Sequence, residues 1–512
     1  MTIPGSHTSA WAATGTIPSF PPLERDLSVD VAIVGGGITG LTAALLLKRA
    51  GVQVALLEAR QIGSGVSGKT TGHLTESLDT RYQTFIQAYG LDRARQIAEA
   101  SRAAIERVAA FVTEEQIDCD FLRVPGYLYT ETDDQVEAIT SEYDAARRVG
   151  IPITLVPETP LPFPVQAAAR FDNQAQFHAM RYLQGLAAAV SGDGCHIFEQ
   201  TRVVHITDGT PCSVQTEQGR QITAAAVIPA THAPINSPAF LQELLPIIQT
   251  RIYPYRSYVL GIRLNQPTAP VGLFWDTAAP YHYTRNFAGE ESNLLIVGGA
   301  DHKTGSTNDT AEPYRNLETY ARAHFDIAAI EYHWSSQVYE PADDLPFIGK
   351  APLSRGVYIA TGYSGNGMTY GTLAGMLLTD ALLDRPNAWS ELYSPARLKP
   401  FTGAKEFISE NIDVATHFVG DRVAGGTQEV ADIPANAGSV VRIKGEQVAV
   451  YRDAQGQLHA CSPVCTHAKC IVHWNTAEQS WDCPCHGGRF DAYGNVLDGP
   501  PVNNLEAKKP DW

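Results

Sequence analysis

The chain has 512 residues, of which 44% are hydrophobic and 18% are charged. This composition excludes a disordered or fibrous protein, and the length predicts two to four folded domains. The formal charge of −17 at pH 7 argues against nucleic acid or an anionic membrane as a partner, because both attract basic surfaces. Residues 1–28 form an N-terminal arm with no Lys or Arg before Arg25, unlike a secretory signal peptide. The uncharged stretch over residues 31–47 contains four glycines and is short for a membrane span. We therefore expect a cytoplasmic protein without a membrane span.

The first clear element is a strand–turn–helix unit. Val31–Val34 is a β-branched run that predicts a strand, and Leu41–Ala50 predicts a helix. The turn between them contains three spaced glycines: Gly35, Gly37 and Gly40. In this pattern the first glycine makes a tight turn, the second lets the backbone approach a pyrophosphate, and the third allows close helix–strand packing. A second strand, Val52–Leu57, ends at Glu58, where a carboxylate can bind ribose hydroxyls. The unit predicts a dinucleotide site but does not separate NAD from FAD.

A long Gly/Ser/Thr loop, RQIGSGVSGKTTGHLT, occupies residues 60–75, where an NAD-binding domain usually continues into another helix. At this point the chain resembles the FAD-dependent amine and amino-acid oxidoreductases of the D-amino-acid-oxidase/glycine-oxidase superfamily. Later segments share the resemblance: residues 201–206, 224–231, 344–349 and 356–362. It implies an α/β (mixed α+β) FAD-binding Rossmann-like domain that is discontinuous in the sequence, over residues 29–80, 162–240 and 337–385.

The resemblance also implies which residues contact FAD. Thr70 and Thr71 lie in the loop, and Val203, or its neighbour Val204, would lie beside the adenine. Further on, a glycine-rich turn opens a helix that runs to about Leu383, and its glycines are Gly362, Gly365 and Gly367. The free N–H groups and the dipole of this helix can hold the negative charge of a reduced flavin. Some relatives attach the flavin covalently through a histidine of the loop. The spacing around His73 differs from theirs, which argues against such a bond here.

Two regions do not fit the nucleotide-binding pattern, and the resemblance assigns them to an antiparallel-sheet substrate domain that covers the flavin: residues 81–161 and 241–336. Periodicity in the first region predicts three helices and a short strand pair, over Tyr82–Ala88, Leu91–Thr113, Gln135–Arg148 and, for the strands, near Phe121–Thr130. The second region is rich in tyrosine and predicts strands over Ile252–Leu264, Tyr281–Phe287 and Leu294–Gly298.

Candidate substrate contacts come from the strands of the second region: Arg256, Tyr258, Tyr281, His282, Tyr283 and Arg285. An arginine suits a carboxylate clamp, and tyrosines can surround an amine, although alternating Tyr and Arg also fits a half-exposed sheet face. Relatives that oxidise glycine or sarcosine often carry an Arg-Pro pair before the Asp-x-x-Pro-x-x-Gly segment. Residues 337–343 contain no arginine, which favours a simple or polyamine-like amine over an α-amino acid. A neutral amine needs no dedicated base for hydride transfer, and the sequence nominates no catalytic acid or base.

Two short clusters near the end of the chain carry a metal-ligand pattern. Cys465-Thr466-His467 and Cys483-Pro484-Cys485-His486 are separated by fifteen residues. They offer two thiolates and two imidazoles, the ligand set of a Rieske [2Fe–2S] centre. The same set could hold Zn²⁺, but C-x-H is not the usual zinc-knuckle spacing. Five of the eight cysteines lie at or after Cys461, which indicates a metal site more than a disulfide framework.

The C-terminal region resembles Rieske domains. A Pro-containing stretch, residues 386–412, predicts a linker, and short β-runs in residues 413–512 predict a small all-β Rieske domain. The resemblance implies that Cys465 and Cys483 bind one iron while His467 and His486 bind the other. Respiratory-type Rieske proteins place a disulfide where this chain has Cys470 and Cys485, and many oxygenase-type ones lack it. Cys461 is then left over as a small core residue.

Together these features predict an FAD-dependent oxidoreductase that takes a hydride from a small-molecule substrate at a C–N bond of an amine or amino acid. The cofactors would be FAD and a [2Fe–2S] cluster. Electrons would pass through the cluster to an external acceptor, either a protein or a quinone-like molecule. Three alternatives remain at this point: oxidation of a hydroxy acid, electron input from a donor such as a ferredoxin, and a redox sensor without turnover.

Overall fold

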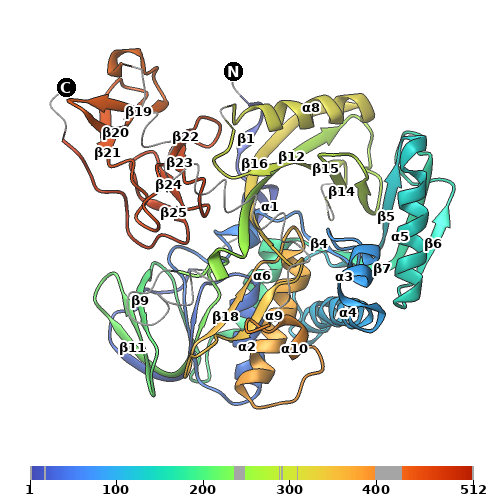
Figure 1. Ribbon diagram of the computed structural model, residues 1–512. Coiled ribbons are helices and arrows are strands. Elements are labelled where there is room, and N and C mark those ends of the chain that lie inside the picture. The colour runs from blue at the N-terminus through green and yellow to red at the C-terminus, as the bar shows by residue number, and fades with distance from the viewer. Residues whose placement is uncertain are drawn as a thin grey trace.

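The computed structural model describes residues 3–15, 19–235, 248–287, 289, 292–307, 309–397 and 429–509. Figure 1 shows a sheet with helices at the bottom, a larger sheet above it, and a C-terminal β-rich part at the upper left. This mixed α/β architecture with a separate β-domain confirms the fold class expected from the sequence. No helix among the described residues is both long and apolar enough to cross a lipid bilayer.

The lower sheet carries the strand–turn–helix unit. Four of its strands, β8, β3, β2 and β11, are parallel neighbours, as expected where helices form the crossovers. Helix α2 (Ile38–Arg49) follows the glycine turn, and α9 (Gly367–Leu382) packs along it through Gly371 and Gly375. A Cβ atom at either glycine would lie 2.5 Å from an α2 side chain, so the helices can approach this closely only because these residues lack one. The sheet has six strands in the order β8 (His196–Phe198), β3 (Val54–Leu57), β2 (Leu27–Val34), β11 (Gln221–Pro229), β10 (Cys212–Thr216) and β9 (Val203–Thr207).

The larger sheet is built around β12, which runs antiparallel to β15 and β16 on its two sides. Alternate residues of β12, including Tyr258 and Leu260, pack beneath α8 (Glu312–His324) against Tyr314 and Leu317, the period of two that a strand dictates. Its described strands follow the order β1 (Ser6–His7), β16 (Ile327–Pro341), β12 (Ile252–Leu264), β15 (Leu294–Lys303), β14 (His282–Asn286), β13 (Leu273–Asp276), β5 (Leu122–Thr130), β7 (Ala167–Gln176) and β4 (His73–Leu74), with β6 (Ile153–Val156) also paired to β7.

The predicted helices of residues 81–161 are present, at the right of Figure 1. They span α3 (Tyr82–Tyr89), α4 (Leu91–Glu114) and α5 (Val136–Arg148). The prediction of a strand pair near Phe121–Thr130 is wrong, because that segment is the single strand β5, which pairs with β7 and β13. The remaining described helices and short 3₁₀ turns are α1 (Ala10–Thr14), α6 (Ala179–Val190), α10 (Ser390–Tyr393), η1 (Val66–Lys69), η2 (Asp133–Gln135) and η3 (Val430–Asp432).

Three segments cross the domain boundaries drawn from the sequence. Strand β7 falls within residues 162–240, predicted to be FAD-binding, yet pairs with β5 in the larger sheet. Strand β16 runs through the boundary at residues 336/337. The N-terminal arm also joins the larger sheet, because β1 pairs with β16 and Trp11 is fully buried. Hydrogen bonding between strands far apart in the sequence produces these differences, and periodicity alone does not encode such pairing.

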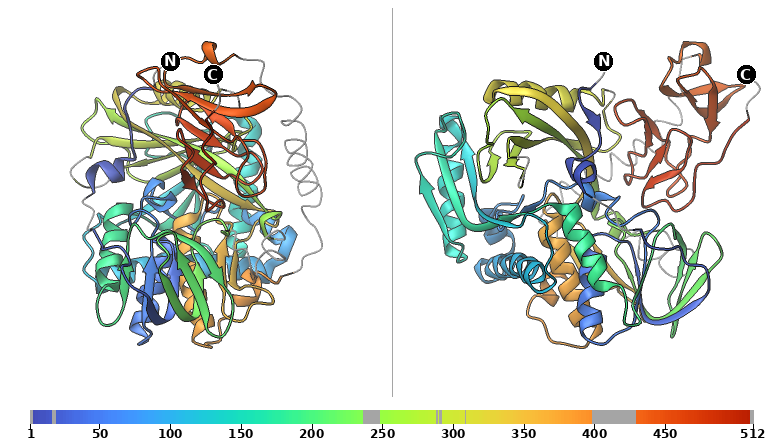
Figure 2. Two further views of the ribbon diagram at one scale, coloured as in Figure 1. Left: turned by 90° about the vertical axis from the view of Figure 1, so that its left-hand side faces the viewer. Right: turned by 180° about the vertical axis from the view of Figure 1, so that it is seen from behind.

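The C-terminal part holds two small antiparallel sheets, β19 (Ala437–Ile443) to β21 (Leu458–Cys461) through β20 (Glu446–Arg452), and β22 to β25. Both views of Figure 2 place it beside the N-terminal strand and the larger sheet. The predicted linker, residues 386–412, begins with α10, while residues 398–428, including the predicted domain start at 413, lie outside the described residues. The second sheet consists of β22 (His473–Asn475), β23 (Ser480–Asp482), β24 (Arg489–Asp491) and β25 (Val496–Asp498).

Candidate active site and cluster site

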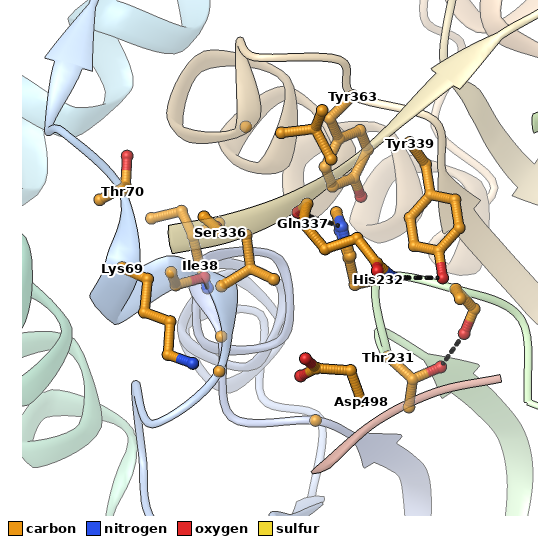
Figure 3. A pocket seen from close by; sticks show the side chains of 18 of the residues that line it. Ile38, Lys69, Thr70, Thr231, His232, Ser336, Gln337, Tyr339, Tyr363 and Asp498 are labelled. Carbon is orange, nitrogen blue, oxygen red and sulfur yellow. Dashed lines mark hydrogen bonds between the residues drawn. The ribbon is translucent and has the colours of Figure 1, made fainter. Parts of the chain in front are cut away.

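A cavity of about 270 Å³ lies where the two large sheets meet. The ends of β2 and β3 open into it at Val34 and Leu57, and the carboxyl ends of parallel strands are where α/β sheets bind ligands. Residues of β14, β15 and β16 line it from the larger sheet, and residues 496–499 and 501–502 line it from the C-terminal domain. Figure 3 shows part of this cavity, including Tyr363 and Asp498. One cavity therefore touches all three parts of the molecule.

The glycine turn after β2 presents bare backbone to this cavity. Gly35 has a φ of +113°, and a Cβ atom there would lie 2.5 Å from the Ala230 carbonyl oxygen. Gly37 lines the cavity. A Cβ atom at Gly40 would lie 2.1 Å from the Gly35 oxygen, so that residue permits the contact between turn and helix. The turn can accept a pyrophosphate at its surface.

Glu58 and Val203 lie in the same wall. The two carboxylate oxygens of Glu58 accept backbone hydrogen bonds from Gly36 at 2.8 Å and Arg60 at 2.9 Å. These bonds hold the carboxylate beside the glycine turn, and each oxygen keeps lone-pair capacity for a ribose hydroxyl. Val203 begins β9 and offers an apolar surface to the cavity. Both side chains are therefore available to a nucleotide.

The loop at residues 60–75 brings Thr70, Thr71, His73 and Lys69 to the cavity. The Thr71 hydroxyl lies 2.9 Å from Nδ1 of His73. Burial, aided by the charge of Arg285, lowers the pKa of His73 to about 3, so its imidazole is neutral. Burial also lowers the pKa of Lys69, and the charge of Asp498 opposes this shift. Figure 3 shows Lys69 and Asp498 extending into the same space.

Gly367, the first residue of α9, and Gly365, just before the helix, line the cavity, whereas Gly362 stands outside the lining at a φ of +79°. The Gly365 N–H donates to Oδ2 of Asp79 at 2.6 Å, so it is not free for a flavin. The side chain of Asn366, the N-cap residue, makes no capping hydrogen bond. The N–H groups that begin the helix therefore remain available, and its positive dipole end faces the cavity.

Only part of the candidate substrate set lines the cavity. Tyr283 and Tyr281 do, but the other four candidates do not. Tyr258 donates to or accepts from Nε2 of His302 at 2.8 Å. His282 pairs with Asp276 at 2.7 Å. These two side chains are directed to other partners by the alternation of their strands.

The two arginines also correct the prediction. Arg256 is 1% exposed and pairs with Glu478 of the C-terminal domain at 3.0 Å. Arg285 is fully buried and donates to the carbonyl oxygens of Gly72 at 2.9 Å and Phe177 at 3.2 Å. Neither guanidinium lines the cavity, and each already donates to other buried acceptors, so neither is placed there as a carboxylate clamp. Sequence alternation indicated a sheet face but not which partner would cover it.

The two cluster loops converge in the C-terminal domain. The rings of His467 and His486 are 5.0 Å apart and nearly perpendicular. Their Nδ1 atoms are buried without a hydrogen-bond partner, as expected for atoms that bind iron. Burial lowers the pKa of these histidines, to about 3 and about 4 respectively, so both imidazoles are neutral ligands. A hydrogen bond with Cys483 lowers the pKa of the Cys465 thiol.

A disulfide joins the same two loops. Cys470 and Cys485 are bonded, with Cα atoms 6.5 Å apart. This bond leaves Cys465 and Cys483 as the free thiols of the two loops. The site fits a [2Fe–2S] cluster with two cysteine and two histidine ligands. It offers two free thiols and two Nδ1 atoms without hydrogen-bond partners, on loops that a disulfide holds together.

Strand β16 connects the cavity to the cluster loops. Gln337 and Tyr339 line the cavity, and Nε2 of Gln337 donates to the Tyr339 hydroxyl at 2.8 Å and to the Gly487 oxygen at 3.0 Å. The Tyr339 hydroxyl lies 3.1 Å from the His486 oxygen and 3.3 Å from the Gly499 oxygen. The side chain of Tyr339 therefore lies between the cavity and the backbone of His486, a predicted cluster ligand. The sequence offered no signal for this role beyond the missing arginine of residues 337–343.

Comparison with known proteins identifies both parts of the molecule. The family model for FAD dependent oxidoreductases matches residues 30–381, and the model for the Rieske [2Fe-2S] domain matches residues 426–509. The chain therefore belongs to the FAD dependent oxidoreductase family and carries a C-terminal Rieske domain. Its cofactors are FAD and a [2Fe–2S] cluster, which confirms the sequence-based expectation and removes the zinc alternative.

Individual relatives share one or both parts. The putative Rieske 2Fe-2S iron-sulfur protein YhfW of Bacillus subtilis is 34% identical over 499 residues, covering 97% of this chain and 96% of that protein. Gamma-glutamylputrescine oxidoreductase of Escherichia coli is 28% identical over 392 residues, covering 73% of this chain and 89% of that protein. The crystal structure of glycine oxidase from Geobacillus kaustophilus has a TM-score of 0.62 at 22% identity, covering 73% of this chain and 100% of that one. This last likeness establishes the fold.

Proposed function

We propose that this enzyme oxidises the C–N bond of an amine or amino acid and passes the electrons through its Rieske cluster to an external one-electron acceptor, a protein or quinone-like molecule. The carrying observation is the hydrogen-bonded bridge of Gln337 and Tyr339, which joins the flavin cavity to the loop of His486. This short connection between the cavity and the cluster loop supports electron transfer from the flavin to the cluster.

The reaction removes two electrons and two protons from the substrate. A C–H bond next to nitrogen breaks with loss of hydride, an N–H proton is released, and a C=N bond forms. Water then converts the imine to a carbonyl compound and releases ammonia, or an amine where the substrate nitrogen carries a second carbon group. FAD, when bound, supplies the hydride acceptor, and the cluster supplies a one-electron carrier. The names of two relatives, gamma-glutamylputrescine oxidoreductase and glycine oxidase, support a C–N substrate.

The chain's own residues position these groups. The glycine turn, Glu58, the loop threonines and the start of α9 surround the space for FAD, which supports these residues as FAD contacts: Gly35, Gly37, Glu58, Thr70, Thr71, Val203 and Gly367. Gly40 permits the contact between the turn and α2, and Gly365 lines the cavity while its N–H bonds Asp79. Gly362 contributes the turn that precedes α9. In the cluster site, Cys465 and Cys483 would hold one iron, and Nδ1 of His467 and His486 the other.

The relay is tested with Cys465→Ser, which removes a cluster ligand, and Cys461→Ser, which removes a buried thiol of the same domain that is not a predicted ligand. The flavin is photoreduced anaerobically with EDTA as the electron donor, and cytochrome c is added as the one-electron acceptor. We expect flavin photoreduction in the unmodified protein and in both variants. Cytochrome c reduction should be nearly abolished by Cys465→Ser and kept by Cys461→Ser.

Equal cytochrome c reduction by Cys465→Ser would remove the relay from the proposal. The substrate class is tested separately, by anaerobic mixing with matched amines, amino acids and hydroxy acids while the flavin absorbance is followed. Bleaching by hydroxy acids alone would overturn the C–N assignment.

A further inference from the structure

The end of the cavity formed by the larger sheet is acidic and aromatic. Asp301 of β15, Tyr283 of β14, Tyr281 just before it and Trp275 of β13 line this end, and Asp79 enters from the loop after β4. The cationic side chains that line the cavity within the described residues are Arg60, Lys69 and Arg202, which belong to the FAD loop and to the residue before β9. The substrate end therefore presents two carboxyl groups and, among the described residues of the lining, no lysine or arginine side chain from the larger sheet.

Asp301 is the most unusual of these residues. Its carboxyl lines the cavity, and its Oδ1 atom is buried without a hydrogen-bond partner. Ser257 supplies one side-chain hydrogen bond to the carboxyl and also bonds the Tyr283 hydroxyl at 2.8 Å. A buried carboxyl with an unsatisfied oxygen is costly unless a donor or a cation arrives. Burial and the charge of Asp79 raise the pKa of Asp301 to about 7.

Asp79 faces the same space. Its side chain is open to the cavity, and its Oδ2 accepts the Gly365 N–H at 2.6 Å. Burial raises the pKa of Tyr281 well above its usual value, and the charges of Asp79, Asp301 and Glu340 raise it further. Three acidic side chains are therefore close enough to act on one tyrosine ring.

We propose that this end of the cavity binds a diamine or polyamine substrate, with a second, non-reacting ammonium group held by Asp301 and Asp79 beside the rings of Tyr281 and Tyr283. An ammonium offers three donors and a positive charge, which satisfies the unpartnered oxygen and relieves the repulsion between the two carboxyls. Tyrosine faces add cation–π attraction. An α-amino acid would bring a carboxylate to an acidic wall, where neither Arg256 nor Arg285 is available to receive it.

This inference rests on the proposed C–N oxidation and specifies its substrate. The test measures binding without turnover, in holoprotein whose flavin has been photoreduced anaerobically so that ligands bind but cannot react. Three ligands of equal chain length are compared by calorimetry: 1,4-diaminobutane, butylamine and 4-aminobutanoate. We expect the diamine to bind on the order of tenfold more tightly than the monoamine, since one charge-assisted hydrogen-bonded contact is at stake, and the amino acid most weakly.

Variants then locate the second ammonium. Asp301→Asn and Asp79→Asn should each weaken diamine binding on the order of tenfold and change butylamine binding far less. Asp172→Asn removes an equal charge from β7 of the same sheet, outside the cavity lining, and should leave both ligands unchanged. Flavin content and the visible spectrum establish that each variant is folded. If Asp301→Asn loses its flavin, Asp79→Asn still tests the proposal.

Equal affinity for diamine and monoamine, or unchanged diamine binding in both variants, would overturn the proposal. Tighter binding of the amino acid would do the same. Failure here is distinguishable from failure of the proposed function. If the diamine binds the reduced protein as expected but never bleaches the oxidised flavin, the site stands and the C–N chemistry falls. Loss of the relay through Cys465→Ser does not depend on which ligand binds.

Discussion

Several residues near the flavin cavity are buried without hydrogen-bond partners for all of their polar atoms, and this burial shifts their pKa values. His73 is kept neutral in this way, and Arg285 donates to backbone carbonyl oxygens while its Nη2 has no hydrogen-bond partner. Asp301 also has one carboxyl oxygen without a hydrogen-bond partner, and burial raises its pKa to about 7. Its protonation therefore changes near neutral pH, where an ordinary aspartate is fully ionised.

Asp301 makes the stability of the substrate-free holoprotein depend on pH. Between its ordinary pKa of 3.8 and about 7, the folded protein keeps a proton that the unfolded chain has lost. The free energy of unfolding should thus fall as pH rises through this window, by at most about 1.4 kcal/mol per pH unit from this group. Asp301→Asn should flatten the dependence, measured by urea unfolding from pH 4.5 to 7.5. An unchanged slope would show that Asp301 titrates normally.

At the scale of elements, strand β16 organises both redox sites. Its first half pairs with β1 and β12 and covers the N-terminal arm. Its last residues, which include Gln337 and Tyr339, line the cavity and bond the cluster loop. The backbone carbonyl oxygen of Tyr339 also accepts the Ser364 N–H at 3.0 Å, next to the start of α9. One strand therefore sets the spacing between the flavin end and the cluster end of the molecule.

Tyr339→Phe removes the hydroxyl that bridges Gln337 and the His486 oxygen. We expect slower electron transfer from photoreduced flavin to the cluster, followed by flash photolysis and the cluster absorbance, while flavin photoreduction itself is unchanged. The lost buried hydrogen bonds should also cost about 1–3 kcal/mol of stability. Tyr129→Phe is the control. Its hydroxyl bonds the Tyr320 hydroxyl at 2.8 Å, and neither residue lines the cavity. Equal transfer rates in both variants would show that the bridge is only structural.

At the scale of the whole molecule, a buried ion cluster holds the Rieske domain against the larger sheet. Glu478 accepts from Arg256 at 3.0 Å and from the Tyr314 hydroxyl at 2.8 Å, and His7 lies 3.4 Å away. Burial raises the pKa of Glu478, but the charges of Arg256 and Arg489 and the hydrogen bond with His7 outweigh it and hold the pKa well below its usual value. The N-terminal arm, the substrate sheet and the Rieske domain meet at this one carboxylate.

Glu478→Gln should separate the domains. Removing the charge leaves Arg256 buried beside an uncharged amide, which we expect to cost about 3–5 kcal/mol. Unfolding followed at the flavin and at the cluster should then show two transitions in place of one. Glu318→Gln breaks an exposed pair within α8 with Arg322 and should cost about 0.5 kcal/mol or less. A loss no larger than this control would mean that Glu478 does not hold the interface.

The sequence by itself determined the parts whose function lies in a short stretch of chain. The glycine turn, Glu58, and the two cluster loops each place their groups within a few residues, so spacing alone specifies the local geometry. The helices of residues 81–161 were likewise predicted to within a few residues, because one apolar face repeats along each. The cluster ligands followed from these local patterns, whereas FAD rather than NAD followed from the family resemblance of the loop at residues 60–75.

Only the tertiary structure determined which groups the side chains of the larger sheet contact. Arg256 and Arg285 looked like substrate ligands in the sequence, but packing directs them to Glu478 and to backbone oxygens. Asp79 and Asp301, far apart in the chain, instead line one end of the cavity. Alternation tells which residues share a face of a strand, but pairing between distant strands determines what that face meets. The acidic substrate end and the bridge at Tyr339 both arise from such pairing.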